Sequence, residues 1–330
     1  MCTAISYVDK EHYFGRNLDL EYSYEEAVVI MPRKFPLPFR MRQEMTEHYA
    51  MIGTAYVVNG YPLYYDGGNE RGLCMAGLMF ANNAGYVPFE DAGEEKEKIA
   101  VFELIPRVLG TCSNIKEARE VLKNIILTDT SFGDELPVTP LHWILADASE
   151  EIVIESTKEG LNIYDNPVGV LTNNPPFPYH LYHLEQYCRL GIKEIKGEPK
   201  ESWQQAAYSK GLNAKGLPGD LSSASRYVRA SFHKKHSVSL QKEEERVHQF
   251  FHLLGSVEMP LGSVETEEGL YEHTVYSSCI NATRGIYYYK TYFNNTVMGI
   301  AMEDANLDET GLYVYKMLKN SKIPVLNREN

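Results

Sequence analysis

Short runs rich in β-branched and aromatic residues recur along the whole chain, and they constrain its fold more than any other feature. Such runs are typical of β-strands. They cover residues 27–30, 54–58, 142–146, 152–155, 168–172, 286–292 and 312–315. Helical patterns fall between the early and the late runs, so that strands come first, then helices, then strands again. This order predicts an α+β fold built from packed layers.

Helical spacing is clearest in residues 247–254, where apolar residues recur at i, i+3, i+4 and i+7. Gly255 follows this segment as a stop signal. Another helix is predicted over 101–109. The first of these helices would bury one face.

Two further helices are predicted from their start signals. Ser113 or Asn114 begins one of them, and Glu117 stands where a capping box needs it. The other follows a turn at residues 218–220 and holds Arg226 in its first turn.

Charge and hydropathy exclude some classes of function. The 330 residues carry a formal net charge of -13, whereas a protein that follows nucleic acid or an anionic membrane needs a basic face. The chain opens without the basic and apolar regions of a secretion signal, and no stretch approaches the roughly 18 apolar residues of a membrane span. We therefore expect a cytoplasmic protein without nucleic-acid or membrane partners. No repeat or long linker marks a boundary, so residues 1–330 are predicted to form a single domain.

The five cysteines do not form a metal or redox motif, because none belongs to a CxxC pair. We expect four of them, all except Cys2, to pack as small apolar residues. His248 and His252 have the i, i+4 spacing of a zinc-binding helix, but Gln249 stands where the catalytic glutamate would be. The pair at residues 180 and 183 is similarly isolated. We expect no metal and no cofactor.

Cys2 is the residue with the most distinctive chemistry. Removal of Met1 would place a thiol and a free α-amine on one residue. That amine, with an ordinary pKa of about 7.7 to 8.0, can act as a base near neutral pH. A nearby cation would favour the thiolate, which is the attacking species. A cysteine in second position is also compatible with an inert thiol, so its neighbours decide between the two.

A short polar cluster at residues 15–19 follows a first strand that starts at Thr3. A hairpin would return this cluster to Cys2. Arg16 would then lie against the thiol, and Asp19 would accept a hydrogen bond from the α-amine. The alternative is an exposed turn in which Arg16 and Asp19 pair only with each other.

Seven motifs distributed over the whole chain resemble those of the choloylglycine hydrolase family, which includes bile salt hydrolases and penicillin V acylases. They stand, in the order and at the spacing of that family, at residues 1–5, 14–19, 61–66, 141–143, 165–175, 216–220 and 287–289. The chain is most similar to the bile salt hydrolases. The resemblance implies the four-layer αββα fold of the N-terminal nucleophile hydrolases, usually as a homotetramer, with loss of Met1 and no longer propeptide.

The resemblance also implies roles for single residues. Cys2 matches the nucleophile, and Arg16 matches the residue that contacts its thiol. Asp19 matches the carboxylate that orients the α-amine, and Arg226 the guanidinium that completes the polar site. Asn173 matches the side-chain donor of the oxyanion hole, where a fixed neutral N–H stabilises charge that develops only in the tetrahedral intermediate.

Residue 79 departs from the family pattern. Bile salt hydrolases carry Asn at this position and penicillin V acylases usually carry Tyr, whereas this chain has Met79. The family uses the backbone N–H of this residue as the second oxyanion donor, which methionine retains, so catalysis should survive. The flexible thioether adds apolar surface beside the scissile bond and can change the choice of substrate.

The activity implied by the resemblance is hydrolysis of the amide bond of glycine- or taurine-conjugated bile acids, through a thioester. By family position, the substrate pocket should include Leu18, Val58, Tyr65, Met79, Phe132 and Leu136. Ordinary packing is the alternative for each of these residues. A penicillin V acylase, another N-acyl amide hydrolase and a binding protein that has lost catalysis remain alternative functions.

Overall fold

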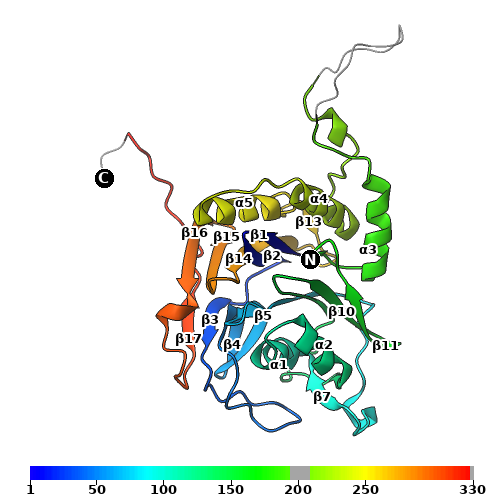
Figure 1. Cartoon of the computed structure of the whole chain (residues 1–330), viewed down its shortest axis with the longest axis vertical. Helices are drawn as coiled ribbons and strands as arrows, with labels where there is room; N and C mark the ends of the chain where they lie inside the picture. The colour runs from blue at the N-terminus through cyan, green and yellow to red at the C-terminus, as the bar shows by residue number, and fades with distance from the viewer. Residues whose placement is uncertain (194–208, 328–330) are drawn as a thin grey trace.

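Two large antiparallel β-sheets lie face to face in the computed structural model, and helices cover their outer faces (Figure 1). The structure describes residues 1–193 and 209–327. The first sheet contains, in spatial order, β12 (Val170–Leu171), β1 (Cys2–Asp9), β2 (Glu11–Leu20), β14 (Tyr271–Asn281), β15 (Ile286–Thr291) and β16 (Asn294–Ala301), and β13 (Val264–Glu265) pairs with β14. The second contains β11 (Gly160–Asp165), β10 (Glu151–Thr157), β9 (Leu141–Ala146), β6 (Cys74–Met79), β5 (Tyr61–Asn69), β4 (Met51–Val58), β3 (Ala27–Met31) and β17 (Tyr313–Lys316). A separate parallel pair joins β7 (Glu97–Ala100) to β8 (Ile125–Thr128).

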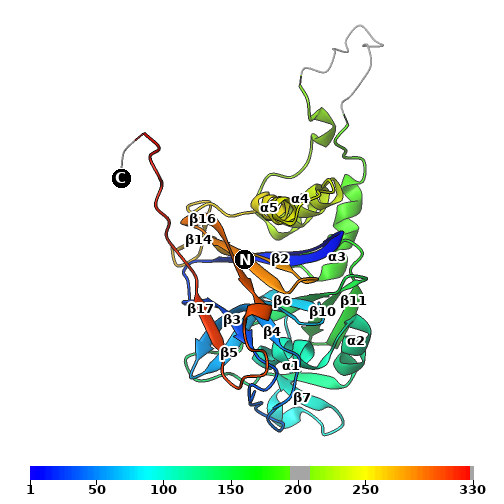
Figure 2. The ribbon, with the colours of Figure 1, turned by 60° about the vertical axis from the view of Figure 1, so that its left-hand side comes forward.

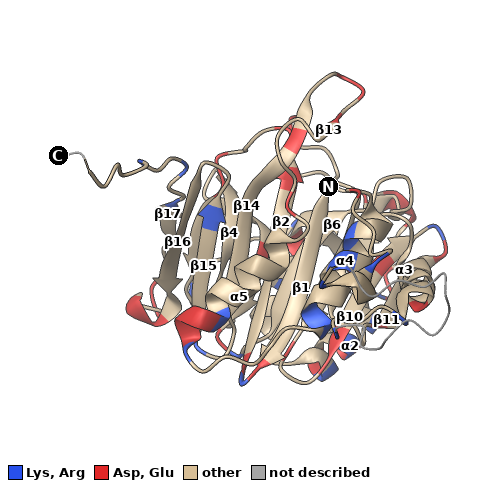
Figure 3. Cartoon of the chain, turned by 90° about the horizontal axis from the view of Figure 1, so that it is seen from above, with Lys and Arg blue, Asp and Glu red and all other residues tan. Residues whose placement is uncertain are grey.

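The outer layers are helical. α4 (Ser223–Lys235) and α5 (Glu243–Gly255) lie on the first sheet, and α3 (Phe177–Leu184) packs beside α4. α1 (Leu104–Thr111) and α2 (Ile115–Lys123) cover the second sheet, as the turned view shows (Figure 2). Figure 3 looks onto α4 and α5 and shows the acidic first turn of α5. Short 3₁₀ turns stand at Phe89–Asp91, Val101–Glu103, Glu185–Tyr187, Leu212–Ala214 and Met302–Asp304.

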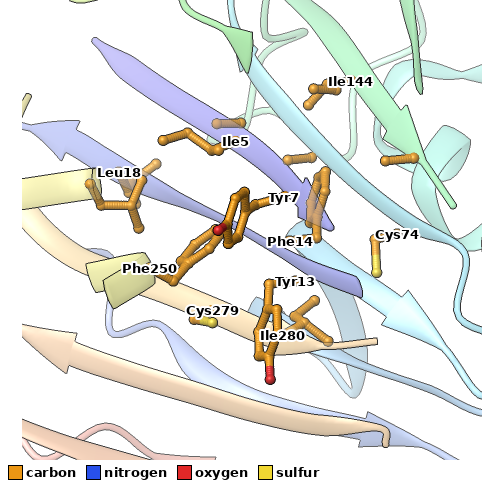
Figure 4. Close-up of a cluster of buried hydrophobic side chains, with 14 of the residues drawn as sticks. Ile5, Tyr7, Tyr13, Phe14, Leu18, Cys74, Ile144, Phe250, Cys279 and Ile280 are labelled. Atoms are coloured by element: carbon orange, nitrogen blue, oxygen red, sulfur yellow. The ribbon is translucent and has the colours of Figure 1, made fainter. Parts of the chain in front are cut away.

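Two apolar cores hold the layers together. In the first, Ile5, Phe14 and Ile280 of the first sheet belong to one cluster with Ile144 of the second sheet and Phe250 of α5 (Figure 4). The second core lies between the second sheet and the helices α1 and α2. The order of layers is therefore helix, sheet, sheet, helix, and the predicted αββα sandwich is confirmed.

β1 and β2 form the hairpin expected from the sequence. Lys10 makes the turn with a positive φ of 59°, and the register places Cys2 opposite Leu18. Both faces of the hairpin are covered, so its residues are buried almost without interruption. A Cβ atom on Gly15 would lie 2.0 Å from the carbonyl oxygen of Ser278, so glycine is required for β2 to approach β14 this closely.

The predicted strands recur in the structure as β3, β4, β9, β10, β12, β15 and β17. The run 168–172 contributes only the two residues of β12. The reason is a turn, in which the side chain of Asn166 accepts hydrogen bonds from the N–H groups of Val168 and Gly169. Among the described residues no helix combines the length and the apolar character that a membrane span needs.

The predicted helices are confirmed with small shifts at their ends. Segment 101–109 opens as a 3₁₀ turn before α1 begins. Asn114 caps α2 by accepting from the N–H of Glu117, whose carboxylate accepts in turn from Ser113 N–H. Gly255 is the last residue of α5 and not the first residue beyond it.

The expectation of four buried cysteines is wrong for one of them. Cys74, Cys112 and Cys279 are buried, whereas Cys188 is exposed. Cys188 follows the 3₁₀ turn that ends the α3 segment, where none of the three residues of the turn is buried.

Candidate active site

Cys2 opens β1 and is only 4% exposed. Arg16, on the neighbouring strand of the hairpin, donates from Nη2 to Cys2 Sγ over 2.5 Å. The same guanidinium donates from Nη1 to the carbonyl oxygens of Gly77, at 2.5 Å, and Tyr65, at 3.3 Å. These bonds fix the cation against the sulfur atom. The expected contact between Arg16 and the thiol is therefore present, and the alternative of an exposed Arg16–Asp19 turn pair is excluded.

The charge of Arg16 persists although the side chain is fully buried. Burial by itself lowers the pKa of its guanidinium, but the Cys2 thiol and then Tyr276 raise it more, so that the net pKa lies above its ordinary value. A buried cation beside a thiol favours the thiolate, the form of sulfur that attacks a carbonyl.

Asp66 is a buried carboxylate next to the site. It belongs to the motif at residues 61–66, but we did not expect it among the site residues. It lies on β5 and accepts hydrogen bonds from the hydroxyls of Tyr276 and Tyr287, both at 2.6 Å. Burial raises the pKa of Asp66, and the nearby Arg16 opposes this shift. Its partners come from the opposite sheet and about 200 residues later in the chain, so no local sequence pattern could reveal the group.

Asp19 is buried beside the N-terminus but does not contact the nitrogen of Cys2. Its Oδ1 accepts from Thr274 Oγ1 at 2.6 Å, and its Oδ2 has no partner within the described ranges. The N-terminal amine of Met1 donates to the main-chain oxygen of Asp19 at 2.6 Å and to Glu272 Oε2 at 2.8 Å. With Met1 attached, the nitrogen of Cys2 is an amide with a single hydrogen, which is used elsewhere. The contact between Asp19 and a free α-amine stays a prediction for the chain without Met1.

Asn173 receives that hydrogen. Its Oδ1 accepts from Cys2 N–H at 2.8 Å and from Arg226 Nη2 at 2.7 Å, and its Nδ2 donates to Met79 O at 2.9 Å. A side-chain amide has two N–H donors, so one hydrogen on Nδ2 remains for a ligand. The amide lies at the meeting point of β1, β6 and α4.

Arg226 joins α4 to the first strand. Its Nη1 donates to Cys2 O at 2.5 Å and to Thr3 Oγ1 at 2.6 Å, while Nε donates to Leu221 O at 2.9 Å. Burial lowers the pKa of Arg226. Ser222 caps α4 through the N–H of Ser225, which sets the helix start one turn before Arg226. The structure thus brings together Cys2, Arg16, Asp19, Asn173 and Arg226, as the sequence led us to expect.

The backbone N–H and C=O groups of Met79 point toward Asn173. Phe80 N–H donates to Pro140 O on the β9 side, and in an antiparallel ladder successive residues direct their backbone groups to opposite sides. Met79 therefore directs its N–H and C=O away from β9. Its C=O accepts from Asn173 on that side, so its N–H points toward the same region.

A cavity of about 310 Å³ opens above Cys2 and Arg16. Of the pocket residues expected from the sequence, Leu18, Tyr65, Met79, Phe132 and Leu136 line it. Val58 does not, because it stands at the end of β4, two residues beyond the lining residue Tyr56. Sequence reasoning missed several other walls, namely Leu20, Tyr24, Tyr56, Leu63, Val101, Phe102 and the loop residues Pro137, Val138 and Thr139. These residues come from six separate segments, and only the fold brings them together.

The two histidine pairs noted in the sequence lie outside the cavity. His248 and His252 lie on α5, and no group of three or more His, Cys, Asp or Glu side chains in the described part of the chain is arranged to hold a metal ion. His180 is buried in α3 near Asn173, whereas His183 is half-buried.

Comparison with known proteins places the chain in a family. A sequence model of the linear amide C-N hydrolases, choloylglycine hydrolase family, matches residues 2–315. The bile salt hydrolase/transferase of Lactiplantibacillus plantarum is 47% identical over 327 residues, which cover 99% of this chain and 100% of that protein. A protein of the same name from Clostridium perfringens is 37% identical, with coverage of 99% and 100%.

Solved structures agree with the sequence comparison. A mutant of the conjugated bile acid hydrolase from Clostridium perfringens superposes with a TM-score of 0.91 at 36% identity, covering 99% of this chain and 100% of that one. Penicillin V acylase from Agrobacterium tumefaciens shares the fold, with a TM-score of 0.75 at 20% identity and coverage of 96% and 91%. The chain belongs to the choloylglycine hydrolase family and is a linear amide C-N hydrolase.

Proposed function

We propose that this chain is a bile salt hydrolase that cleaves the amide bond of glycine- or taurine-conjugated bile acids with the thiol of Cys2. The observation that carries the proposal is the 2.5 Å contact between Arg16 Nη2 and Cys2 Sγ at the floor of the cavity. The substrate is supported by the two relatives that are 47% and 37% identical, both named bile salt hydrolase/transferase.

The first chemical step is attack of the Cys2 thiolate on the amide carbonyl. The carbonyl oxygen gains negative charge as the tetrahedral intermediate forms. The remaining hydrogen on Asn173 Nδ2 and the N–H of Met79 would stabilise this charge. A single donor of this kind typically contributes about 100- to 1000-fold in kcat.

The second requirement is proton transfer, for which the proposal uses the α-amine of Cys2 after removal of Met1. The amine takes the proton of the Cys2 thiol as the thiolate forms, and passes it to the departing nitrogen of glycine or taurine as the C–N bond breaks and the thioester remains. It then takes a proton from the water that attacks the thioester, and returns this proton to the Cys2 sulfur as the C–S bond breaks and the bile acid is released. Asp19 Oδ2, without a partner in the described structure, is the acceptor that would hold the amine in position.

The cavity suits a steroid acyl group. Its walls are mostly aliphatic and aromatic side chains, with Glu135 and a few hydroxyls among them. Such a composition binds a large apolar ligand and leaves orientation to a small number of polar groups.

Other amide substrates use the same catalytic residues. A penicillin V acylase would differ only in the pocket. The solved penicillin V acylase from Agrobacterium tumefaciens is 20% identical to this chain, and this likeness supports a shared fold alone. The word transferase in the names of the two relatives points to transfer of the acyl group from the thioester to an amine instead of to water. A binding protein without catalysis is disfavoured, because it has no use for a buried guanidinium against a thiol.

The experiment is amine release by the Met1-free protein from glycocholate, taurocholate and penicillin V. Cys2→Ala should abolish release, and the matched control Cys188→Ala, which removes an exposed thiol, should retain the full rate. Release mainly from penicillin V would move the chain to the acylases, and no release from any substrate would favour the binding protein. Mass spectrometry checks the role of the amine, because full activity with Met1 attached would contradict it.

We also propose that residues 1–330 act as a single domain, that the chain assembles into a homotetramer and that it works in the cytoplasm. These proposals rest on the family resemblance of the whole chain. Light scattering of the purified protein tests the assembly, and a monomer at micromolar concentration would contradict it.

A further inference from the structure

The short segment that carries Asn173 is held by two buried histidines with no role in the reaction as proposed. This segment, residues 172–176, connects β12 to α3. His142 reaches it from β9 and His180 from α3, and neither side chain is exposed to solvent. Neither histidine lines the cavity.

His142 binds the carbonyl oxygen of Thr172. Its Nε2 lies 2.9 Å from this oxygen, and because a carbonyl only accepts, Nε2 carries a proton. On the other edge of the ring, Nδ1 lies 3.0 Å from Glu155 Oε1, which also accepts from Phe177 N–H at 2.9 Å. The face of the ring stacks on Phe80, with centroids 4.4 Å apart. His142 is thus fixed at both edges and on one face.

His180 binds the carbonyl oxygen of Asn173 itself. Its Nε2 lies 2.9 Å from that oxygen and must also donate. Burial lowers the pKa of His180 to about 4, so near neutral pH the ring is neutral and keeps its single proton on Nε2. The ring stacks on Tyr227, with centroids 4.9 Å apart.

The remaining main-chain group of Asn173 is also occupied, since its N–H donates to Ser223 Oγ at 2.9 Å. Both peptide planes that adjoin Asn173 are therefore fixed, one through Thr172 O and the other through Asn173 O. An oxyanion hole is effective only when its donors are in place before the charge develops. A displacement of about 1 Å can reduce the rate about 100-fold.

We propose that His142 and His180 are positioning residues of the oxyanion hole, which hold the segment so that Asn173 Nδ2 points at the carbonyl oxygen of the substrate. Glu155 supports this arrangement by orienting His142. The inference rests on the proposed function, in which Asn173 donates to the oxyanion. Because the histidines act through Asn173, their loss should reduce kcat and leave KM nearly unchanged.

The test is a double-mutant cycle in the Met1-free enzyme, with glycocholate and taurocholate as substrates. His180→Ala alone should lower kcat by about 10- to 100-fold. In an Asn173→Ala background the same change should lower kcat little further, because the group that it positions is gone. His180→Gln, which keeps an N–H donor near the place of Nε2, should recover most of the rate.

His183→Ala is the matched control. His183 lies on the same helix, but its ring stacks on Tyr179, with centroids 5.5 Å apart. It should retain the wild-type kcat. If His180→Ala does not fold, His180→Asn gives the same cycle, since its shorter side chain withdraws the donor from Asn173 O.

Two results would overturn the inference while leaving the proposed hydrolysis intact. In the first, His180→Ala lowers kcat by the same factor in the Asn173→Ala background as in the wild type. In the second, His180→Gln has a kcat as low as that of His180→Ala. Full turnover by Cys2→Ala would instead refute the proposed function, and the inference with it.

Discussion

Arg16 and Arg226 bring two positive charges to the centre of the molecule, where neither side chain is exposed. An unpaired charge in such a place is very costly. Both guanidiniums donate to main-chain carbonyl oxygens, and two buried carboxylates, Asp19 and Asp66, counter their charge. This balance allows a cation to lie against the thiol of Cys2 without water to solvate it.

The side chain of Met79 is expected to affect substrate choice more than catalysis. Met79→Ala keeps the backbone N–H that faces Asn173 and removes a flexible wall of the cavity. We expect kcat for the preferred substrate to change by less than about threefold, because the loss of one backbone donor would cost about 100-fold or more. The ratio of kcat/KM between glycocholate and penicillin V should change by a larger factor. A 100-fold fall in kcat for every substrate would show that the side chain itself takes part in catalysis.

At the level of single residues, the sequence was informative where the chain is locally connected. A hairpin at residues 3–19 is expected to bring Arg16 back to Cys2, with an exposed turn pair of Arg16 and Asp19 as the alternative. Asn173 and Arg226 belong to distant segments, and only the resemblance to a family pointed to them. His180 was set aside as an isolated histidine, because its partner is a main-chain oxygen that no sequence pattern reveals.

Among the elements, the loop between β8 and β9 contributes the largest share of the cavity wall. Eight of its residues, from Thr130 to Thr139, line the cavity. Arg40 anchors this loop, donating from Nη2 to Phe132 O at 2.6 Å. Its guanidinium also lies over the rings of Phe132, at 5.1 Å, and Phe102, at 5.7 Å. One exposed side chain therefore holds the loop against the aromatic end of the cavity.

Loss of this anchor should weaken substrate binding without slowing the chemistry. An exposed cation–π contact contributes about 0.5 to 1 kcal/mol, and 1 kcal/mol corresponds to about fivefold in affinity. We expect Arg40→Ala to raise KM about fivefold and to leave kcat within about twofold, measured by steady-state amine release. Arg42→Ala is the control, since Arg42 lies over Phe39 and outside the cavity. An equal rise in KM in both variants would contradict the anchoring role.

The start of α2 provides a prediction about pH. Asp147 accepts hydrogen bonds from the N–H groups of Ile115, Ser149 and Glu150. Burial by itself raises the pKa of Asp147, but the bonds from Ser149 and Ile115 outweigh it and hold the pKa below its ordinary value of 3.8. A carboxylate with a lowered pKa stabilises the fold above the pKa of its unfolded state and loses this contribution as the pH falls.

Asp147→Asn should therefore destabilise the protein at pH 7 by about 1.5 to 3 kcal/mol, the typical contribution of a hydrogen bond to a charged group. The difference from wild type should shrink as the pH falls below about 3.8. Urea unfolding of the wild type and the variant at a series of pH values measures the difference at pH 7 and its decrease at low pH. Asp134→Asn, in an exposed turn, should show no difference, and a constant gap at all pH values would exclude the role of ionised Asp147.

Two of the elements that the sequence did not reveal, β14 and α3, contribute to the site. β14 contains polar residues along a buried strand, and these residues have partners in the site: Thr274 donates to Asp19, and Ser277 donates to Asn17. The apolar pattern that marks a strand is therefore interrupted where the strand is functional. α3 was missed for a similar reason, because its short sequence is rich in aromatic residues with modest helix propensity.

At the scale of the whole molecule, polar contacts join the two sheets in addition to the apolar core. Asp66 belongs to the second sheet, whereas Tyr276 and Tyr287 belong to the first. Thr54, on the strand beside Asp66, also contacts the hydroxyl of Tyr287 at 2.5 Å. These contacts fix how the two sheets pack against each other next to Arg16. They therefore connect the stability of the sandwich to the geometry at Cys2.

Asp66→Ala should accordingly reduce both stability and activity. It leaves two tyrosine hydroxyls without their acceptor and the buried charge of Arg16 without one of its counter-charges. Breaking a buried charged group of this kind typically costs about 3 to 5 kcal/mol, which urea unfolding at pH 7 would measure. Tyr287→Phe removes a single hydroxyl and should cost only about 1 kcal/mol. If both variants lost the same small amount, the carboxylate would have no special role between the sheets, and the charge of Arg16 would be balanced by the other groups around it, Cys2, Tyr276 and Asp19.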